Sequence, residues 1–336
     1  MSATIHRLAG RVPSLDPMIE LVAGDMNLVN AVILDRMQSQ IPLIPELAGH
    51  LIAGGGKRMR PMLTLASARL VGYTGARHHR LAAAVEFIHT ATLLHDDVVD
   101  GSDLRRGKRT ANNIWGNPAS VLVGDYLFSR SFELMVEADS LKALKILSHA
   151  SAVIAEGEVN QLTAVRRVDL GEDRYLDIID AKTAALFAAA CRVAAVVAER
   201  GEEEEAALDA YGRNLGIAFQ LVDDAIDYTS DAGTMGKDAG DDFREGKVTL
   251  PVILAYARGS EADRAFWKDA IEGRRSSDAD FAQAVSLVQG TRAVDDALAR
   301  ARHYGQRAID AIGRFPNGKA KDAMVEAVEF AVARAY

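Results

Sequence analysis

Three aspartates follow directly on a largely apolar stretch in the first third of the chain. Residues 81–94 contain no glycine or proline, and the letters HDDVVD then supply Asp96, Asp97 and Asp100. Residues four apart lie on one face of a helix, about 5–6 Å apart, so Asp96 and Asp100 are stacked with Asp97 beside them. Stacked carboxylates at a helix C-terminus repel each other and the helix dipole, and a hard divalent cation with oxygen ligands relieves this repulsion. The spacing therefore predicts a divalent metal site.

The same spacing recurs in the second half of the chain. The letters FQLVDDAIDY place Asp223, Asp224 and Asp227 within another segment of apolar residues. A single copy of this pattern is also typical of a solvated acidic helix face. Two copies, each preceded by residues that favour burial, instead indicate two acidic helix ends that face each other and hold several metal ions.

Basic residues lie close to the acidic ones in the sequence. The first aspartate motif is followed by Arg105, Arg106, Lys108 and Arg109. Residues 54–61 read GGGKRMRP, which is not a Walker loop, because the glycine spacing and the Ser/Thr after the lysine are absent. This segment fits either an ordinary basic loop or a diphosphate clamp, in which Lys57 supplies a point charge and Arg60 a planar fork.

The composition is that of an ordinary soluble globular protein. The chain has 336 residues, of which 49% are hydrophobic and 26% charged, and its formal net charge is −8. The negative charge argues against a nucleic-acid partner, and Cys191 stands alone, so no disulfide can form within the chain. We expect no signal peptide or transmembrane segment, and hence a cytoplasmic protein. No linker is evident, so we expect an irregular segment over residues 1–16 and one domain over residues 17–336.

Helical periodicity extends over most of the chain. We expect helices over residues 17–37, 62–71, 81–100, 118–136, 141–165 and 173–199, and amphipathic helices from residue 252 to the end. A polar turn over residues 72–79 contains His78 and His79, which we interpret as solvated turn residues. Taken alone, His89 is typical of a hydrogen-bonded core histidine. No strand-like alternation of useful length occurs, so the chain is predicted to be all-α.

Taken in order, these motifs resemble the all-trans polyprenyl diphosphate synthases, and most of all the long-chain bacterial branch that includes the octaprenyl diphosphate synthases. Between about residues 54 and 251 the chain contains GGGKRMRP, FIHTATLLHDDVVDGSDLRRG, GDYLF, AEGEVNQL, KTAALF, FQLVDDAIDY and GKDAGDDFREGK. The resemblance implies a single-domain helical bundle of the isoprenoid synthase type with a central active-site cavity, and a homodimer. Phe243 and Val248 stand where family members usually carry Leu and Pro, which affects loop stiffness rather than charge.

The resemblance also implies roles residue by residue. It implies Mg²⁺, with three ions per site, held by Asp96, Asp100, Asp223 and Asp227 and supported by Asp97 and Asp224. Contacts to an allylic diphosphate are implied for Arg105, Lys182, Thr183, Gln220, Lys237 and Lys247. Contacts to isopentenyl diphosphate are implied for Lys57, Arg60, His89 and Arg106. Departure of the allylic diphosphate would leave a cation that isopentenyl diphosphate attacks, and the released pyrophosphate would take the proton. By analogy the product is a polyprenyl diphosphate of about C40–C50 for a quinone side chain.

Several alternatives stay open at this point. Terpene cyclases share the first aspartate motif, but their second site mixes Asn, Ser or Thr with Glu. Head-to-head synthases lack GGGKRMRP and the RRG after the first motif. A shorter-chain synthase (geranylgeranyl or farnesyl), a metal-dependent phosphohydrolase and a non-catalytic subunit of a heteromeric synthase are further alternatives. Such subunits tend to lose the acidic motifs, whereas this chain keeps both.

Product length is expected to depend on the helix that carries the first motif. Ala91 and Thr92 precede Asp96 by five and four residues, lie one helical turn below it, and are small. Short-chain relatives have bulky aromatic residues there. We therefore expect the growing tail to pass this point and to end at a floor formed by Phe132 and Met135, unless the two small residues only fill a tight helix–helix contact. A hand-off of the apolar product at a membrane surface is a further expectation.

Overall fold

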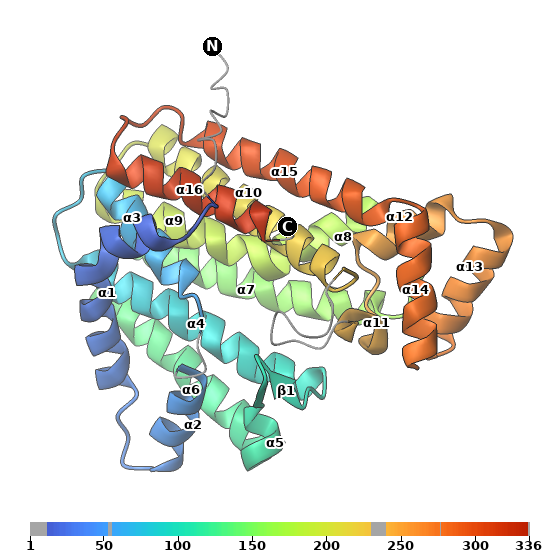
Figure 1. Ribbon diagram of the computed structural model, residues 1–336. Coiled ribbons are helices and arrows are strands. Elements are labelled where there is room, and N and C mark those ends of the chain that lie inside the picture. The colour runs from blue at the N-terminus through green and yellow to red at the C-terminus, as the bar shows by residue number, and fades with distance from the viewer. Residues whose placement is uncertain (1–11, 53–55, 230–239, 276, 335–336) are drawn as a thin grey trace.

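The computed structural model describes residues 12–52, 56–229, 240–275 and 277–334, and helices dominate it (Figure 1). The elements in chain order are α1 (Asp16–Arg36), α2 (Leu43–Ile52), α3 (Met59–Leu70), α4 (Arg77–Val99), β1 (Leu104–Arg105), β2 (Lys108–Arg109), α5 (Ala111–Trp115), α6 (Asn117–Glu137), α7 (Leu141–Ala164), α8 (Glu172–Ile179), η1 (Asp180–Ala184), α9 (Ala185–Val197), α10 (Glu202–Ile226), α11 (Asp241–Glu245), α12 (Leu250–Arg258), α13 (Glu261–Trp267), η2 (Lys268–Glu272), α14 (Asp278–Gly290), α15 (Ala293–Ala311) and α16 (Lys319–Ala333).

The all-α prediction is confirmed, and a short hairpin is the departure from it among the described residues. Strands β1 and β2 pair antiparallel, with Leu104 opposite Arg109 and Arg105 opposite Lys108. The connecting Arg106 and Gly107 have φ of 55° and 72°, as a two-residue turn of the primed type requires. The hairpin follows α4 directly, so it holds Arg105 and Arg106 close to the first aspartate motif.

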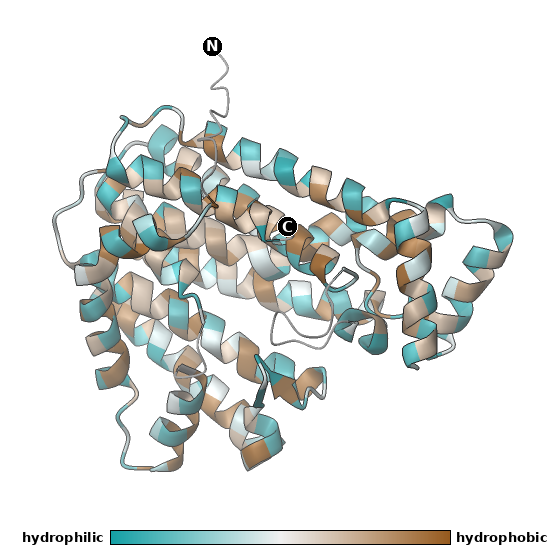
Figure 2. Cartoon of the chain, in the orientation of Figure 1, coloured by the Kyte–Doolittle hydropathy of each residue, from teal (hydrophilic) through white to brown (hydrophobic). Residues whose placement is uncertain are grey.

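Helices α4, α9 and α10 form the centre of the bundle, and long parts of each are buried on several faces. In α4 the run from Leu81 to Val85 is fully buried, and α9 is buried along nearly all of its length. Helix α4 packs most extensively on α6, and α10 packs on α9 and α15. The peripheral α15 instead alternates hydrophobic and hydrophilic residues along its length (Figure 2), as expected for a helix with one buried face.

Two hydrophobic clusters fill the interior, and α10 contributes to both. The first cluster joins α1, α3, α4, α6, α9 and α16, and it includes Leu208, Tyr211 and Leu215 from the first half of α10. The second joins α8, α12, α14 and α15, and it includes Leu221 and Val222 from the second half of α10. The position of Asp223 at the end of α10 is therefore fixed by packing along the whole helix.

The segment 173–199, which the periodicity predicts as one helix, is divided by the π-helical turn η1 between α8 and α9. Glycines of the neighbouring helices allow η1 and α9 to approach closely. A Cβ at Gly157 of α7 would lie 2.8 Å from the Ala181 Cβ, and a Cβ at Gly216 of α10 would lie 2.6 Å from the Ala184 Cα. Turns of this kind often occur at functional sites, and this one carries Lys182 and Thr183.

The interpretation of His78 and His79 as solvated turn residues is wrong. Helix α4 begins at Arg77, so both histidines lie in its first turn. His78 is 3% exposed, and its ring meets the edge of the Tyr73 ring at a centroid distance of 5.2 Å. Both imidazoles face Asp25 of α1, a partner that is distant in the sequence. Tertiary contacts therefore extend the helix into a segment that local polarity assigns to a turn.

Helix α1 bears on the expectation that the chain has no signal peptide or transmembrane segment. Among the described residues it is the one helix long and apolar enough to cross a membrane, judged by length and composition only. One face of α1, with Met18, Val22, Val29 and Ile33, is buried in the first hydrophobic cluster. The core helix of a soluble protein and a signal sequence near the N-terminus pass the same test, so a single helix of this kind is weak evidence for a membrane span.

Candidate active site

The two aspartate motifs lie at the same end of the bundle, and adjacent residues of η1 connect them. Lys182 Nζ lies 3.9 Å from Asp96 Oδ2 on α4, while Thr183 Oγ1 donates to Gln220 Oε1 on α10 at 3.0 Å. Lys247, which follows α11, adds a link to the first motif, since its Nζ donates to Asp100 Oδ2 at 3.0 Å. The structure thus brings together the acidic helix ends that their spacing predicts to face each other.

Asp96 is held among charges of both signs. Burial raises its pKa to about 6, Lys182 opposes this shift, and the negative charges of Glu158 and Asp100 add to it. Lys182 donates to Glu158 Oε2 at 2.9 Å, so the ammonium lies between the two carboxylates. The raised pKa means that the surrounding cations do not fully offset the free-energy cost of burying the charged Asp96 carboxylate at neutral pH.

Asp97 is fully buried and orients Arg105. Its Oδ1 accepts two hydrogen bonds from that guanidinium, from Nε at 2.8 Å and from Nη2 at 2.7 Å. Its Oδ2 has no hydrogen-bond partner among the described residues. The two-point contact fixes the guanidinium plane of Arg105 beside the first motif, which agrees with a supporting role for Asp97.

The aspartates of the second motif differ in their surroundings. The Asp223 carboxylate forms an ion pair with Arg334, with 2.9 Å between Oδ1 and Nη1. Asp224 is buried, accepts from Tyr175 Oη at 2.6 Å and from Gln220 Nε2 at 2.7 Å, and has its pKa raised to about 7 by burial and by nearby carboxylates. The carboxylate of Asp227 accepts hydrogen bonds from the backbone N–H groups of Gly240 at 3.1 Å and Asp242 at 3.3 Å, so it holds the start of α11.

This donor set fits hard divalent cations. Carboxylate oxygens from α4 and α10 converge here, and such oxygens are the ligands that Mg²⁺ and Ca²⁺ prefer. Three of these carboxylates already attract cationic side chains, Asp96 through Lys182, Asp100 through Lys247 and Asp223 through Arg334. Burial raises the pKa of Asp96 to about 6 although Lys182 opposes the shift, so the nearby ammonium does not offset the cost of burying the charged carboxylate. Asp96, Asp100 and Asp223 are therefore the carboxylates best suited to hold metal.

Lys247 is a permanent cation at this end of the bundle. Burial works against its charge, but Asp242, Asp100 and Glu245 together hold its pKa well above the ordinary value. Its Nζ lies 2.5 Å from Glu245 Oε2 and 3.0 Å from Asp100 Oδ2. Lys182 and Lys247 thus reach the first motif from two different segments, as a clamp around a diphosphate requires.

A second basic group lies between α3, α4 and α9. Arg60 Nη1 donates to His89 Nε2 at 3.1 Å, and its guanidinium stacks 4.5 Å from the centroid of the Phe187 ring. Burial lowers the pKa of Arg60 to about 10, which leaves it charged at neutral pH. Burial, with the charges of Arg60 and Arg106, holds the pKa of His89 well below its usual range, so His89 is neutral and can accept this hydrogen bond.

Glu86 is the counter-ion of this basic group, and sequence reasoning missed it. It is buried on α4, and its Oε1 lies 3.4 Å from Arg58 Nη1. Burial raises the pKa of Glu86, whereas the charges of Arg58, Arg60 and Arg106 lower it. Gly56, which lies shortly before α3, is also close to Arg106, because a Cβ at Gly56 would lie 2.8 Å from Arg106 Nη1. An acidic residue within an otherwise apolar helix is the signal that could have identified Glu86.

The remaining predicted residues have varied positions. Lys57 lies over the Phe330 ring at 4.6 Å, and Lys237 lies outside the described residues. Ala91 is buried, and Thr92 Oγ1 donates to the His89 carbonyl at 2.8 Å. Met135 is fully buried, whereas Phe132 is 37% exposed on the outside of α6. Of the two residues predicted to form the floor of the product cavity, Met135 is buried within one copy of the chain and Phe132 is not.

Arg334 is a further residue at the site. Besides its ion pair with Asp223, its Nη2 donates to the Phe219 carbonyl at 3.2 Å. Its guanidinium lies 3.9 Å from the centroid of the Phe219 ring. The C-terminal end of α16 therefore reaches the second aspartate motif, a contact between residues more than a hundred positions apart that no local pattern predicts.

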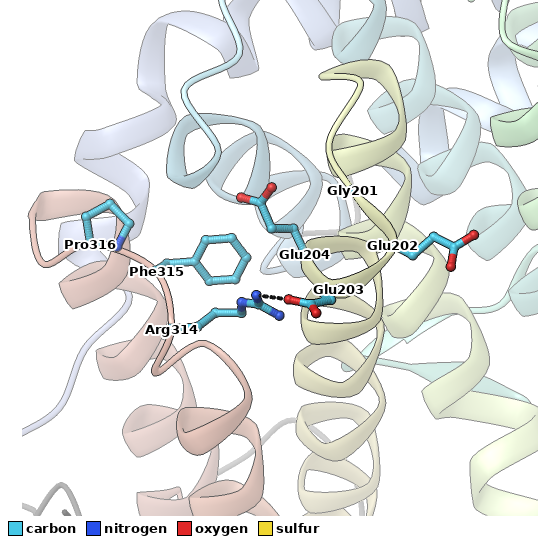
Figure 3. A pocket seen from close by; sticks show the side chains of 7 residues that line it. All are labelled: Gly201, Glu202, Glu203, Glu204, Arg314, Phe315 and Pro316. Atoms are coloured by element: carbon cyan, nitrogen blue, oxygen red, sulfur yellow. Dashed lines mark hydrogen bonds and ion pairs between the residues drawn. The ribbon is translucent and has the colours of Figure 1, made fainter.

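A surface hollow of about 570 Å³ lies between the start of α10 and the turn that follows α15 (Figure 3). It is lined by Gly201, Glu202, Glu203, Glu204, Arg314, Phe315 and Pro316. Glu202 and Asp223 are 21 residues apart on α10, which corresponds to about 32 Å of helix. The hollow is acidic and shares no residue with the predicted site, so it is not a candidate for binding a diphosphate substrate.

Comparison with known proteins gives a consistent result. The sequence profile of the polyprenyl synthetase family matches residues 41–288. The chain is 43% identical to the octaprenyl diphosphate synthase of Haemophilus influenzae, over 96% of this chain and 98% of that protein. It is 41% identical to the all-trans-nonaprenyl-diphosphate synthase (geranyl-diphosphate specific) of Rhodobacter capsulatus, over 93% and 96% of the two chains.

A solved structure is also closely similar. The polyprenyl synthase of Caulobacter crescentus CB15, complexed with calcium and isoprenyl diphosphate, has a TM-score of 0.94 and 53% sequence identity. The match covers 97% of this chain and 99% of that one. A divalent cation and an isoprenyl diphosphate thus occur together in that relative.

Proposed function

Because the chain belongs to the polyprenyl synthetase family, and is a prenyltransferase of the long-chain trans type, we propose that it condenses isopentenyl diphosphate repeatedly with an allylic diphosphate such as farnesyl diphosphate. By analogy with the similar relatives, the product is an all-trans polyprenyl diphosphate of about C40–C50. The observation that carries this proposal is the pair Lys182–Thr183, which links the two aspartate motifs around one site.

The family depends on Mg²⁺, and we assign three ions to this site. Asp96, Asp100 and Asp223 are the proposed ligands, while Asp227 stands at the edge of this set because its carboxylate also holds the start of α11. Bound Mg²⁺ supplies positive charge that neutralises the departing diphosphate. Arg334 and Lys247 would have to release their carboxylates, which makes both side chains available to substrate diphosphates.

The allylic diphosphate is proposed to lie between the two motifs. Lys182 and Lys247 reach this position from opposite segments, and Arg105 is oriented toward it by Asp97. Their fixed charges stabilise the leaving diphosphate without reorganisation during the reaction. Gln220 and Thr183 are hydrogen-bonded to each other beside Lys182 and complete the polar lining.

Isopentenyl diphosphate is proposed to bind the second basic group. Arg60 and Arg106 supply charge around Glu86, and Lys57 lies at the more exposed edge. His89 is neutral and hydrogen-bonded to Arg60, so it orients that guanidinium and does not act as a base. The proton lost after carbon–carbon bond formation therefore goes to the released pyrophosphate in this proposal.

Chain length is proposed to depend on Ala91 and Thr92 below Asp96. Both are small, and the Thr92 hydroxyl is satisfied by the His89 carbonyl and presents no free donor to an apolar tail. Met135 is the enclosed candidate for the cavity floor. Phe132 could contribute only from the outer face of α6, where it packs edge-on against Phe128 at a centroid distance of 5.2 Å.

We further propose a cytoplasmic homodimer in which residues 17–336 form one domain. Large apolar side chains are exposed along α6 and α7, namely Leu122, Val136, Leu141, Val159 and Leu162. A second copy of the chain that covered these faces would remove them from water. The single domain is supported by α10, which contributes to both hydrophobic clusters. The apolar product would be handed off at a membrane, for use as a quinone side chain.

The proposed reaction can be tested with purified protein, farnesyl diphosphate and isopentenyl diphosphate. Turnover is expected in Mg²⁺, loss of turnover in EDTA, and recovery when Mg²⁺ is restored. Phosphate release without carbon–carbon bond formation, or no reaction with any allylic diphosphate, would overturn the proposal. Sedimentation at micromolar concentration tests the homodimer separately, and a stable, active monomer would contradict it.

A further inference from the structure

His78 and His79 lie at the end of α4 opposite to the aspartate motif, and both face Asp25 of α1. Asp25 Oδ1 is 3.0 Å from His79 Nε2 and 3.9 Å from His78 Nε2. His79 and Asp96 are 17 residues apart on α4, which corresponds to about 26 Å of helix. The three side chains are therefore a cluster separate from the proposed active site.

The His78 imidazole is buried without a hydrogen bond. Asp25 is 6% exposed and His78 is 3% exposed. His78 Nδ1 has no partner among the described residues, and Nε2 is too far from Asp25 Oδ1 for a hydrogen bond. Buried polar atoms are costly unless they are satisfied. A metal ion that accepts the Nε2 lone pair between these side chains would satisfy one of the two ring nitrogens of His78.

The residue types suit a metal ligand set. Two imidazole nitrogens and a carboxylate oxygen lie close together, and these are common ligands of Zn²⁺.

We propose that Asp25, His78 and His79 form a binding site for a transition metal ion such as Zn²⁺, which joins α1 to the start of α4. Their ligand atoms all lie within 4.8 Å of one another. Bonds of 2.0–2.1 Å in a tetrahedral zinc site place ligand atoms about 3.3 Å apart. This value lies between the 3.0 Å and 3.9 Å that separate Asp25 Oδ1 from the Nε2 atoms of His79 and His78. Three protein ligands leave the fourth position to water.

Arg69 orients the carboxylate and also limits the affinity. Its Nε and Nη2 donate to Asp25 Oδ2 at 3.0 and 2.8 Å, which turns Oδ1 toward the imidazoles, as outer hydrogen bonds do in metal sites. The guanidinium and the positive N-terminus of α4 both disfavour a cation. With one carboxylate and two imidazoles, the site discriminates against Mg²⁺ and Ca²⁺, which need several oxygen ligands.

This selectivity allows the site to be measured apart from the active site. The full-length protein, stripped with EDTA and desalted, would be titrated with Zn²⁺ in excess Mg²⁺ by isothermal titration calorimetry, since Mg²⁺ occupies the carboxylate-rich site. Co²⁺ would be used as a spectroscopic probe, because its visible absorption reports ligand type and geometry. Saturable uptake of one ion per chain and a rise in Tm with Zn²⁺ are expected.

Two variants and a matched control assign the ligands. In His79→Gln the amide can still donate to Asp25 but the metal-binding nitrogen is lost, and His78→Phe fills the buried space without a ligand atom. Both should lose Zn²⁺ affinity by at least about 100-fold, whereas His149→Gln, at an exposed position on α7, should bind like the unaltered chain. No saturable uptake in excess Mg²⁺, or undiminished uptake by His79→Gln, would overturn the proposal. If His78→Phe does not fold, His79→Gln alone decides.

Discussion

Replacing Asp96 by Asn should stabilise the metal-free protein while abolishing turnover. Burial raises the pKa of Asp96 to about 6 from the ordinary 3.8, with Lys182 opposing and Glu158 and Asp100 adding to the shift. One pKa unit corresponds to about 1.4 kcal/mol, so the charged Asp96 costs the folded state on the order of 3 kcal/mol. Asn resembles the protonated carboxyl and avoids this cost.

The sign of the pH dependence follows from the direction of the shift. Because the folded-state pKa lies above the unfolded-state pKa, the cost is complete above the folded-state value, declines as the pH falls through about 6, and disappears below the ordinary 3.8. Asp96→Asn should therefore gain on the order of 3 kcal/mol over the unaltered chain at about pH 7.5 and nearly nothing at about pH 4. With an unfolding entropy of about 2.1 cal/mol/K per residue, this gain raises the Tm by about 4 °C in a chain of 336 residues.

Thermal unfolding followed by circular dichroism in EDTA, over a pH series, measures this difference. Asp35→Asn is the matched control, because Asp35 is exposed on α1 and should give the same Tm as the unaltered chain within about 1 °C. Added Mg²⁺ and a diphosphate should stabilise the unaltered chain more than Asp96→Asn. Equal Tm values at about pH 7.5, or a difference that does not change with pH, would refute the claim that Asp96 carries uncompensated charge.

The remaining predictions concern catalysis and product length. Lys182→Met should lower kcat by about 10²–10³-fold through loss of one preorganised charge, and steady-state rates within tenfold of normal would contradict this. Arg60→Lys keeps the charge but loses the planar stack on Phe187, so the KM for isopentenyl diphosphate should rise while that for the allylic substrate stays unchanged; an equal rise in both would mean that the subsites are wrongly assigned. Ala91→Phe should stop elongation early at a near-normal initial rate, and full-length product from this variant would show that the tail does not pass α4 at Ala91.

The sequence predicted those features that depend on local spacing. The i, i+4 aspartates on α4 and α10 required only helix geometry, and the basic segments beside them followed from their order in the chain. The predicted convergence of the two motifs was correct because each aspartate lies at the end of an apolar helix whose burial is determined by its own residues.

Features that depend on distant partners were not predictable in the same way. His78 and His79 were misinterpreted because their partner Asp25 lies on another helix and only the folded chain brings them together. The π-helical turn at Lys182 interrupts a segment whose periodicity is continuous, and glycines on α7 and α10 lie close against it. Arg334 reaches Asp223 from the other end of the chain. Such tertiary contacts leave no periodic signal in a single sequence.

The most direct test of the proposed function is the mass spectrum of the extracted product after incubation with Mg²⁺, farnesyl diphosphate and excess isopentenyl diphosphate. Repeated condensation predicts linear polyprenyl chains that increase by one isoprene unit and end at about C40–C50 by analogy with the similar relatives. A product that ends after one or two condensations would indicate a short-chain synthase. A cyclised hydrocarbon, or farnesol and phosphate without any chain growth, would contradict the assignment of the two aspartate motifs to chain elongation.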